Sequence, residues 1–367
     1  MRSSVRVAVS ALVAGAAVAY ATPAYASTVT QVSVTSTGFF GGFNDVTSVS
    51  ATDGWAVGGN GNGFVQRYNG SRWSTVTSPD LLAGGNTWAI LSGVDSVSSS
   101  TSFAVGRTTG SAGGAAVALR WNGSAWSRLT VPRPAGTNTS FTSVKAFSAS
   151  DAWAVGTTST SSIAMTLAMH YTGSGWTTTP TPSPGTRNNW VTAVDGTAAN
   201  DVWAVGYSLN LPYGNRIRQS MILHWNGTAW SQLSSPNNGS TFLYDVAPVS
   251  RTDAWAVGSN TAGAFVARWN GTTWSTVAAP SLTALQSVTA RSSTDVWVAG
   301  SDAAGAPALA HWNGSGWSVT TVNVTGGVGA PGLTAVTVAD AGTEWAVGYQ
   351  ADGTTGQSAS IAFRVAG

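Results

Sequence analysis

The chain contains no cysteine. This absence excludes disulfide bonds, thiolate zinc sites, thiol nucleophiles and lipid attachment through sulfur. A folded domain built from these 367 residues must therefore be held together by its apolar core, and the chain is long enough to bury a sizeable one.

Charged side chains are also scarce, at 8% of the sequence, with one lysine, Lys145, and one glutamate, Glu344. Two of the 16 basic residues, Arg2 and Arg6, stand at the start of an apolar N-terminal segment, and the others match the 14 acidic residues in number. Nucleic-acid binding needs a dense basic surface, which this composition does not supply. We therefore expect no nucleic-acid partner.

Long apolar runs are absent except near the N-terminus. There, Arg2 and Arg6 precede the apolar run VAVSALVAGAAVAYA, and Ala24-Tyr25-Ala26 forms a small-residue cleavage site. This is the pattern of a secretory signal peptide. No later stretch supplies the roughly 20 apolar residues of a membrane-spanning helix. The sequence predicts a signal peptide at 1–26 and a single secreted domain at 27–367, extracellular, monomeric and without membrane insertion.

What the sequence does contain is an internal repeat. The hexapeptide DGWAVG at 53–58 recurs as DAWAVG, DVWAVG, DAWAVG, DVWVAG and TEWAVG, with TSFAVG as a weaker copy. Each copy has a valine seven residues before its first residue and a large apolar residue ten before it. Such constant spacing indicates a repeat architecture. The aromatic position is occupied by Trp55, Phe103, Trp153, Trp203, Trp255, Trp297 and Trp345.

A second motif follows each of the first six copies, in the forms YNGSRW, WNGSAW, YTGSGW, WNGTAW, WNGTTW and WNGSGW. Asn-Gly between β-forming residues predicts a hairpin with a type I′ turn. Each unit then has four strands: strand a ends before the Asp, strand b is the WAVG run, strand c leads into WNG, and strand d starts at the second Trp. Seven such units predict an all-β fold, a seven-bladed β-propeller of four-stranded blades, with a right-handed solenoid as the alternative.

The seventh unit lacks a strand d, because it ends at FRVAG. The stretch VTQVSVT at 29–35 aligns without gaps on VTTVNVT at 319–325, the strand d of the sixth unit. We therefore expect the N-terminal strand to complete blade seven and close the ring. Closure leaves no bare sheet edge, and it favours the propeller over the solenoid.

The spacings also distinguish two faces of the ring. The a–b and c–d turns have constant length in the repeats, whereas the b–c and d–a connections vary. In an up-and-down meander the constant connections share one face, here called the constant face, and the others share the variable face. Loops of varying length carry ligand specificity in repeat proteins. We therefore expect binding at the variable face.

The longest variable-face loops surround blades two to four and contain Trp88 and Trp190, which stand outside the repeat positions. An exposed aromatic ring can stack on a sugar while neighbouring polar groups bind its hydroxyls. The alternative is that both tryptophans pack beneath their own loops and that the arginines are solvated. The candidate ligand-binding residues are Trp88, Trp190, Arg187, Tyr213, Arg216 and Arg218.

The histidines do not indicate catalysis. His170, His224 and His311 occupy one repeat position, which holds arginine in the other four copies. Residues spread around a ring cannot easily share one metal ion, so we expect no metal site and no cofactor. We expect each basic residue to pair with the Asp that begins strand b of its own blade, except in blades two and seven, where Thr101 and Thr343 replace that Asp and can offer only a hydroxyl to the arginine. These pairs include Asp53–Arg67, Asp201–His224 and Asp253–Arg268.

Some carboxylates remain as candidates for chemistry. Asp302 and Asp352 lie in variable-face loops of adjacent blades, and glycoside hydrolysis uses two carboxylates. Four further aspartates of strand a face the expected channel, where they can bind a cation, a polar ligand or ordered water. They are Asp45 and Asp245 in one register and Asp95 and Asp195 in another.

The paired motifs D-x-W-A-V-G and W-N-G-[ST]-x-W cover nearly all of the chain after residue 26. In this respect the chain resembles secreted β-propeller repeat proteins of actinobacteria and related soil bacteria. The resemblance implies a propeller fold and an exported location, and it brings no catalytic residues. The predicted function is a non-enzymatic module that binds an extracellular glycan or protein. The alternatives are a carbohydrate-active hydrolase or lyase that uses Asp302, Asp352 or the strand-a aspartates of the channel, and an interaction scaffold without a small ligand.

Overall fold

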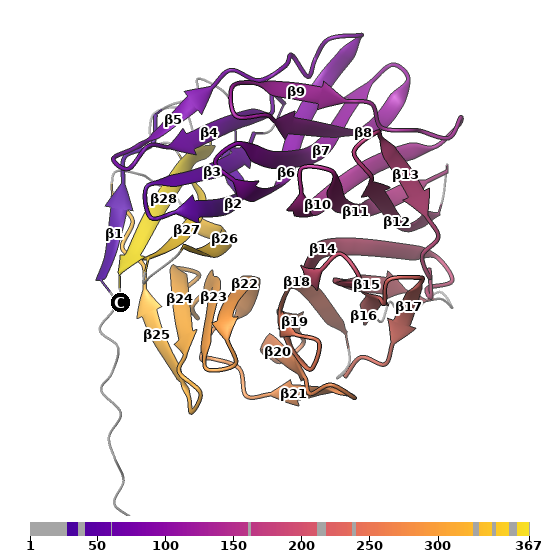
Figure 1. Cartoon of the computed structure of the whole chain (residues 1–367). Coiled ribbons are helices and arrows are strands. Elements are labelled where there is room, and N and C mark those ends of the chain that lie inside the picture. The colour runs from indigo at the N-terminus through magenta and orange to yellow at the C-terminus, as the bar shows by residue number, and fades with distance from the viewer. Residues whose placement is uncertain are drawn as a thin grey trace, which may run out of the picture.

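A computed structural model describes residues 28–35, 41–59, 61–160, 163–210, 218–236, 240–325, 330–339, 343–351 and 358–366. The predicted signal peptide at 1–26 lies outside these residues. The described chain forms seven antiparallel sheets of four strands each, arranged in a ring around a central channel (Figure 1). The seven-bladed β-propeller predicted from the repeats is therefore confirmed.

In blades one to six the four strands follow the chain from the centre of the ring to its rim, and in blade seven the N-terminal strand takes the outermost place. Blades one to three consist of β2 (Phe43–Ser50), β3 (Asp53–Gly58), β4 (Phe64–Tyr68), β5 (Trp73–Val76), β6 (Asn86–Ser98), β7 (Thr101–Gly110), β8 (Gly113–Trp121), β9 (Trp126–Leu129), β10 (Asn138–Ser148), β11 (Asp151–Ser159), β12 (Ala164–Tyr171) and β13 (Trp176–Thr179). Blades four and five consist of β14 (Asn188–Ala198), β15 (Asp201–Leu209), β16 (Arg218–Trp225), β17 (Trp230–Leu233), β18 (Thr241–Ser250), β19 (Asp253–Asn260), β20 (Gly263–Trp269) and β21 (Trp274–Val277). Blades six and seven consist of β22 (Ala284–Ser292), β23 (Asp295–Ser301), β24 (Pro307–Trp312), β25 (Trp317–Thr321), β26 (Gly332–Ala339), β27 (Thr343–Ala351), β28 (Ser358–Ala366) and β1 (Thr28–Val32).

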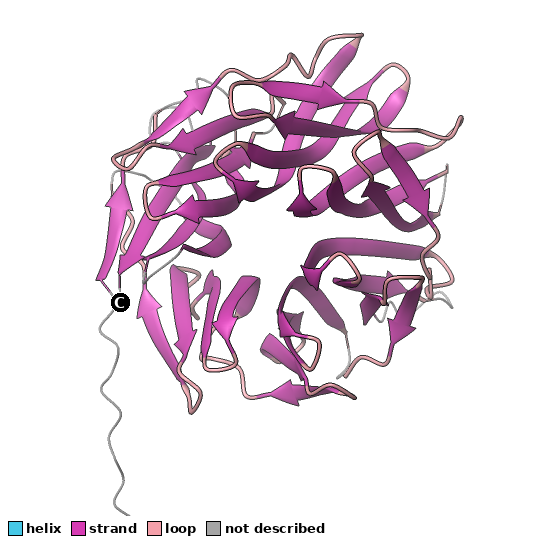
Figure 2. Ribbon diagram, in the orientation of Figure 1, coloured by secondary structure: helices cyan, strands magenta, loops and turns pink. Residues whose placement is uncertain are grey.

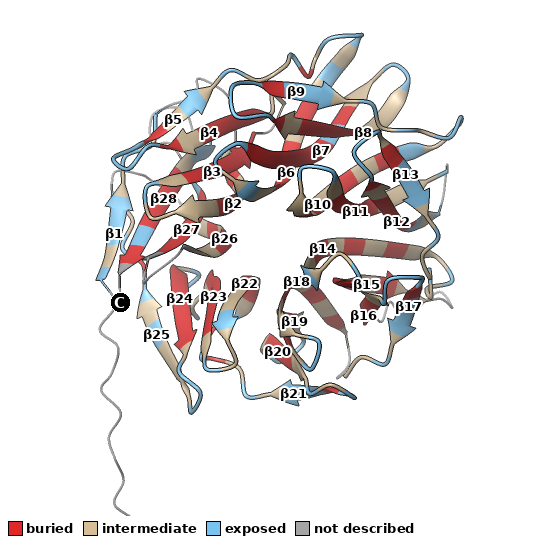
Figure 3. Ribbon diagram, in the orientation of Figure 1, coloured by how far each residue is buried: buried red, intermediate tan, exposed pale blue. Residues whose placement is uncertain are grey.

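The described residues are strands, turns and loops (Figure 2), and no helix among them has the length and apolarity to cross a membrane. Strand b is the most deeply buried strand: in β15 the run from Asp201 to Gly206 is buried throughout. A strand covered on both faces is expected to be continuously apolar, and the neighbouring blades supply that cover. The outermost strands expose more of their residues to solvent: in β17, Trp230 is buried and the next two residues are exposed (Figure 3).

The blades stack through tryptophans. Trp203 of blade four lies 5.4 Å, centroid to centroid, from both Trp269 and Trp274 of blade five, and the contact with Trp274 is edge-on. The corresponding rings meet at the junctions of blades one and two, two and three, three and four, five and six, and seven and one. At the junction of blades six and seven, Trp297 packs in a cluster with Phe363 and Val365, since the seventh unit lacks the second motif.

Strand a carries a β-bulge directly after its large apolar residue in every blade. A bulge turns a side chain away from the regular ladder. In blade four the hydroxyl of Thr192, at the bulge, donates to the carbonyls of Val205 in its own blade at 3.0 Å and Leu243 in the next at 2.9 Å. The bulge therefore connects the inner strands of neighbouring blades.

The ring closes as predicted, because β1 pairs with β28 and completes blade seven. The register differs from the gapless alignment by two residues: Gln31, not Val29, lies opposite Phe363. A shift of two keeps every side chain on its expected face, so the apolar pattern alone does not distinguish the registers. The shift is accompanied by a second contact, in which Thr35 donates its backbone N–H to the carbonyl of Trp73, at 3.0 Å, in blade one.

The Asn-Gly hairpins are four-residue loops and not the predicted two-residue type I′ turns. Trp225 lies opposite Trp230, so that residues 226–229 form the loop, and Gly227 has a φ of 95°. The side-chain oxygen of Asn226 accepts hydrogen bonds from the backbone N–H of Thr228 and Ala229 and from the Thr228 hydroxyl, at 2.7–3.0 Å. These bonds explain why Ser or Thr follows Gly in the five copies that have the asparagine; in the third copy Thr172 takes its place.

Candidate functional site

The constant face is confirmed by contacts between its two kinds of turn. A Cβ added at Gly227, in the c–d loop of blade four, would lie 2.9 Å from the side chain of Asn200 in the a–b turn of the same blade. The corresponding glycines of blades one, two, three, five and six meet their own a–b turns in the same way. The invariance of these loops therefore has a packing cause.

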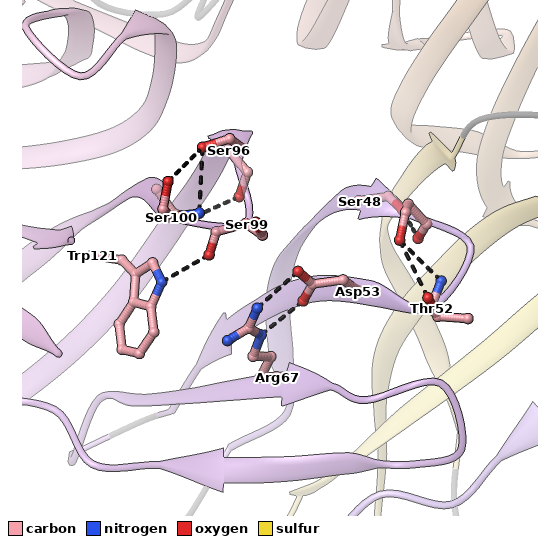
Figure 4. A network of polar contacts seen from close by, with 11 residues as sticks. Ser48, Thr52, Asp53, Arg67, Ser96, Ser99, Ser100 and Trp121 are labelled. Atoms are coloured by element: carbon pink, nitrogen blue, oxygen red, sulfur yellow. Dashed lines mark hydrogen bonds and ion pairs between the residues drawn. The ribbon is translucent and has the colours of Figure 1, made fainter. Parts of the chain in front are cut away.

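In blades one, three, four, five and six the basic residue of strand c pairs with the strand-b aspartate, as predicted. Nε and Nη2 of Arg67 donate to the two oxygens of Asp53 at 2.7 and 2.8 Å (Figure 4). The guanidinium lies 5.1 Å from the centroid of Trp55. In blade four, His224 lies 2.7 Å from Asp201 and its ring is 4.1 Å from that of Trp203. The remaining described pairs are Arg268–Asp253, His170–Asp151 and His311–Asp295.

These pairs stabilise individual blades and do not converge on one point. Within the described residues, no group of three or more His, Asp or Glu side chains is arranged to hold a metal ion. The hydrogen bond from His311, supported by Arg291, lowers the pKa of Asp295 although burial opposes the shift. Each histidine is thus accounted for by one aspartate and one tryptophan of its own blade.

Glu344 stands at a position that holds Gly, Ser, Ala or Val in the other six copies, and it connects blade seven to blade six. Its side chain is 2% exposed, and Oε1 lies 2.7 Å from Nη1 of Arg291, which also contacts Asp295 at 3.2 Å. Burial raises the pKa of Glu344, and Arg291 partly opposes the shift. This ion pair lies at the junction of blades six and seven, where the aromatic pair of the second motif is missing, so it has an evident structural role.

The channel aspartates are half-buried and accept hydrogen bonds from inner-strand backbone. Asp45 accepts from the N–H groups of Val46 and Val94, each at 2.8 Å. Asp245 is bonded in the same way by Val246 at 2.8 Å and Val288 at 2.9 Å. Burial raises the pKa of Asp45 to about 8 and that of Asp245 to about 7, against the backbone hydrogen bonds. Their carboxyl groups bridge two inner strands.

The second register of channel residues is organised by the only lysine of the chain. Lys145 Nζ lies 2.7 Å from Asp195 and 3.8 Å from Asp95. Burial alone would lower the pKa of Lys145, but the two carboxylates raise it, so the ammonium stays charged. These groups line a cavity of about 390 Å³ in the channel. The aspartates expected to bind a cation or polar ligand are therefore engaged by lysine and by backbone.

The candidate residues of the variable face do not form a single cluster. Trp88 lies in blade two, where the guanidinium of Arg107 is 4.8 Å from its ring centroid. Trp190 lies in blade four, opposite Tyr207 of the adjacent strand. Backbone N–H of Arg187 donates to the carbonyl of Leu209 at 3.3 Å. Tyr213 and Arg216 lie outside the described residues.

Around Trp190 the structure reveals an aromatic row that sequence reasoning missed. The row runs from Trp190 to Tyr207 at 5.0 Å, to Phe242 of blade five at 4.9 Å, and to Tyr244 at 6.0 Å, centroid to centroid. All four rings are half-buried, and Arg218 lies 5.1 Å above the ring of Phe242. Here "aromatic row" means these four rings together with Arg218.

A sequence signal for this row existed. The residue before the large apolar residue of strand a is aromatic only in blades four and five, as Trp190 and Phe242, and the position holds Gly, Ile, Ser or Ala elsewhere. The residue after the strand-b glycine is Tyr207 in blade four. Departures from a repeat at the variable-face ends of strands mark this surface as different from the other junctions.

Of the two loop carboxylates in the enzymatic alternative, the structure describes only Asp302. Asp302 Oδ1 accepts hydrogen bonds from the backbone N–H groups of Ala304 and Ala306, both at 2.9 Å, within its own b–c loop. Asp352 lies outside the described residues. Asp302 therefore has a local role in its turn.

Comparison with known proteins supports the fold. No protein-family model matches the chain, and a search of curated proteins finds no sequence match. Among solved structures, YCF48 bound to D1 peptide is similar with a TM-score of 0.60 and 16% identity, over 93% of this chain and 97% of that one. The WD40 β-propeller domain of Doa1 is similar with a TM-score of 0.59 and 13% identity, over 91% and 96%. At such identity the likeness establishes a shared β-propeller fold.

Proposed function

We propose that the protein is a secreted, non-enzymatic binding module that recognises an extracellular glycan or protein through its variable face. The observation that carries this proposal is the aromatic row, in which four half-buried rings and one arginine meet across two blades at the variable face. Rings with both apolar faces and polar edges are enriched at recognition surfaces.

Several features support a binding role over an enzymatic one. The histidines and the strand-b aspartates are paired within blades, and Asp302 is engaged in its own turn. YCF48, which shares the fold, binds a peptide in one solved structure, so partner binding is compatible with this architecture. Fold likeness alone does not choose the ligand.

Export and a monomeric state are parts of the same proposal. The support for export is the signal-peptide pattern of residues 1–26 and the resemblance of the paired motifs to secreted propellers of actinobacteria and related soil bacteria. N-terminal sequencing of the protein recovered from the culture medium of a producing bacterium is expected to start at Ser27. Recovery only inside the cells would contradict export.

The binding function is tested by screening the purified domain on a glycan array, a peptide library and soluble polysaccharides. We expect binding that Trp190→Ala weakens and Asp302→Asn leaves unchanged. Released sugar that disappears only in Asp302→Asn would instead support the hydrolase or lyase. Binding that persists in every variable-face variant would place recognition elsewhere.

A further inference from the structure

Arg218 is the charged member of the aromatic row, and none of the described residues forms an ion pair with it. Its guanidinium lies over Phe242, and within the described chain no carboxylate lies at ion-pair distance from it. By contrast, Arg67, Arg268 and Arg291 all pair with acids. A guanidinium stacked on a ring keeps its in-plane N–H groups, which match the two oxygens of a carboxylate.

The other polar groups of the row are the hydroxyls of Tyr207 and Tyr244 and the indole N–H of Trp190. Burial, reinforced by the neighbouring Tyr244, raises the pKa of Tyr207 against the effect of Arg218, so this phenol keeps its proton at neutral pH. Ser259 donates to the hydroxyl of Tyr244 at 3.3 Å. The row therefore offers apolar ring faces, hydroxyl groups and a single positive charge, a combination that complements an anionic, hydroxyl-rich ligand.

On the basis of the proposed function, we propose that the aromatic row binds an anionic glycan, with sugar rings packed on Trp190, Tyr207 and Phe242 and a uronate carboxylate paired with Arg218. The centroid separations of 5.0 and 4.9 Å make the strip continuous across the junction of blades four and five. An extended chain of sugars can follow such a strip. Its hydroxyls meet the phenols, and its carboxylate meets the guanidinium.

A peptide is the less favoured occupant. Recognition of a peptide by strand addition needs an open strand edge. Tyr207 lies in β15, which is paired on one side with β14 and on the other with β16. At Tyr207 this strand has no open edge, so it offers a ligand the ring and hydroxyl of that side chain and not its backbone.

The test is isothermal titration of the whole secreted domain with polygalacturonate and with its methyl ester, which has the same backbone without the charge. We expect the acid form to bind more tightly and to weaken as salt increases. Arg218→Gln should weaken binding of the acid form about tenfold, as for loss of one charge-assisted hydrogen bond, and leave the ester unaffected. Phe242→Ala should weaken both forms.

The matched control is Arg107→Gln, because Arg107 lies over Trp88 at the variable face in the same kind of contact. We expect this variant to bind as the wild type does. A larger effect of Arg107→Gln than of Arg218→Gln would overturn the assignment to the aromatic row. Thermal unfolding of each variant is measured in parallel, so that a loss of binding is compared only among folded proteins.

The outcomes separate this inference from the proposed function. Equal affinity for polygalacturonate and its ester, or binding of library peptides but of neither polymer, would overturn the anionic-glycan assignment and leave the binding function standing. If no variable-face substitution changes the binding of any glycan or peptide, the anionic-glycan assignment and the proposed binding function are both overturned.

Discussion

The constant and variable faces of this propeller are built from the same strands but follow different rules. At the constant face of blade four, a four-residue loop held by the asparagine at its first position packs on an a–b turn of fixed length. Beside it, His224 contacts both an aspartate and a tryptophan of the same blade. At the variable face the equivalent strand ends differ between blades, and two neighbouring blades supply an aromatic row. Repetition thus accompanies packing, and departure from repetition marks the candidate ligand site.

The largest expected difference between the faces is in stability. Trp203→Ala removes a ring that is 1% exposed and packed on Trp269 and Trp274, and we expect it to lower the free energy of unfolding by about 3–5 kcal/mol. Trp190→Ala removes a half-buried ring and should cost less than about 2 kcal/mol. Denaturant titration measures both. Similar costs would remove the distinction between a packing tryptophan and a recognition tryptophan.

The channel aspartates provide a pH test of the wall that joins the faces. The folded protein holds the pKa of Asp45 at about 8, above the ordinary 3.8, so it binds more protons than the unfolded chain between these values. This contribution to stability is present below pH 4 and is lost as pH rises through about 8. From pH 5 to about 8 this group should lower the free energy of unfolding by about 1.4 kcal/mol per pH unit, about 4 kcal/mol in all, and we expect Asp45→Asn to remove that difference between pH 5 and pH 9.

The control for this pH test is Ser143→Ala. Ser143 occupies the corresponding strand-a position in blade three, and its hydroxyl accepts from the N–H of Val194 at 3.2 Å without titrating. This variant should lose some stability equally at both pH values. An unchanged pH dependence in Asp45→Asn would mean that the carboxyl group is ionised throughout the range.

The hairpin loop of the constant face should be destabilised by removal of one side-chain amide, that of Asn226. In Asn226→Ala, the N–H groups of Thr228 and Ala229 lose their acceptor, and we expect a loss of about 1 kcal/mol, as for removal of a capping side chain. Thr228→Ala removes only the hydroxyl bond and should cost less. Both substitutions also abolish the Asn-x-Thr sequence at which asparagine can be glycosylated. An equal loss of stability in the two variants would therefore point to glycosylation of Asn226 and not to the hydrogen bonds of the loop.

The smallest effect is expected where the chain varies in length. A Ser-Gly insertion between Gly84 and Gly85, in the d–a connection where an added Cβ meets no atom within 4 Å, should cost less than about 0.5 kcal/mol. The same insertion between Gly123 and Ser124 of the c–d loop would separate Ser124 from the Asn122 side chain that holds it at 2.9 Å. Thermal unfolding compares the two. Equal tolerance would contradict the contrast between the faces.

Some of the differences between expectation and structure have identifiable physical causes. The offset of β1 by two residues preserves the alternation of faces, so sequence alignment could not detect it. The hairpin loops proved longer because the asparagine side chain replaces a backbone partner, which the Asn-Gly pattern alone does not indicate. Trp88 and Trp190 were grouped by their shared departure from the repeat, whereas their blades place them in separate contacts.

The sequence by itself determined the number of blades, their four strands, the closure of the ring by the N-terminal strand and the Asp–basic pairs, because these depend on local periodicity repeated in every copy. Only the tertiary structure decided which side chains of different blades meet: Lys145 between Asp95 and Asp195 in the channel, Arg291 on Glu344, and Tyr207 on Phe242 beneath Arg218. Such contacts depend on how neighbouring sheets stack and where bulges direct the inner strands, and no spacing along the chain encodes that stacking.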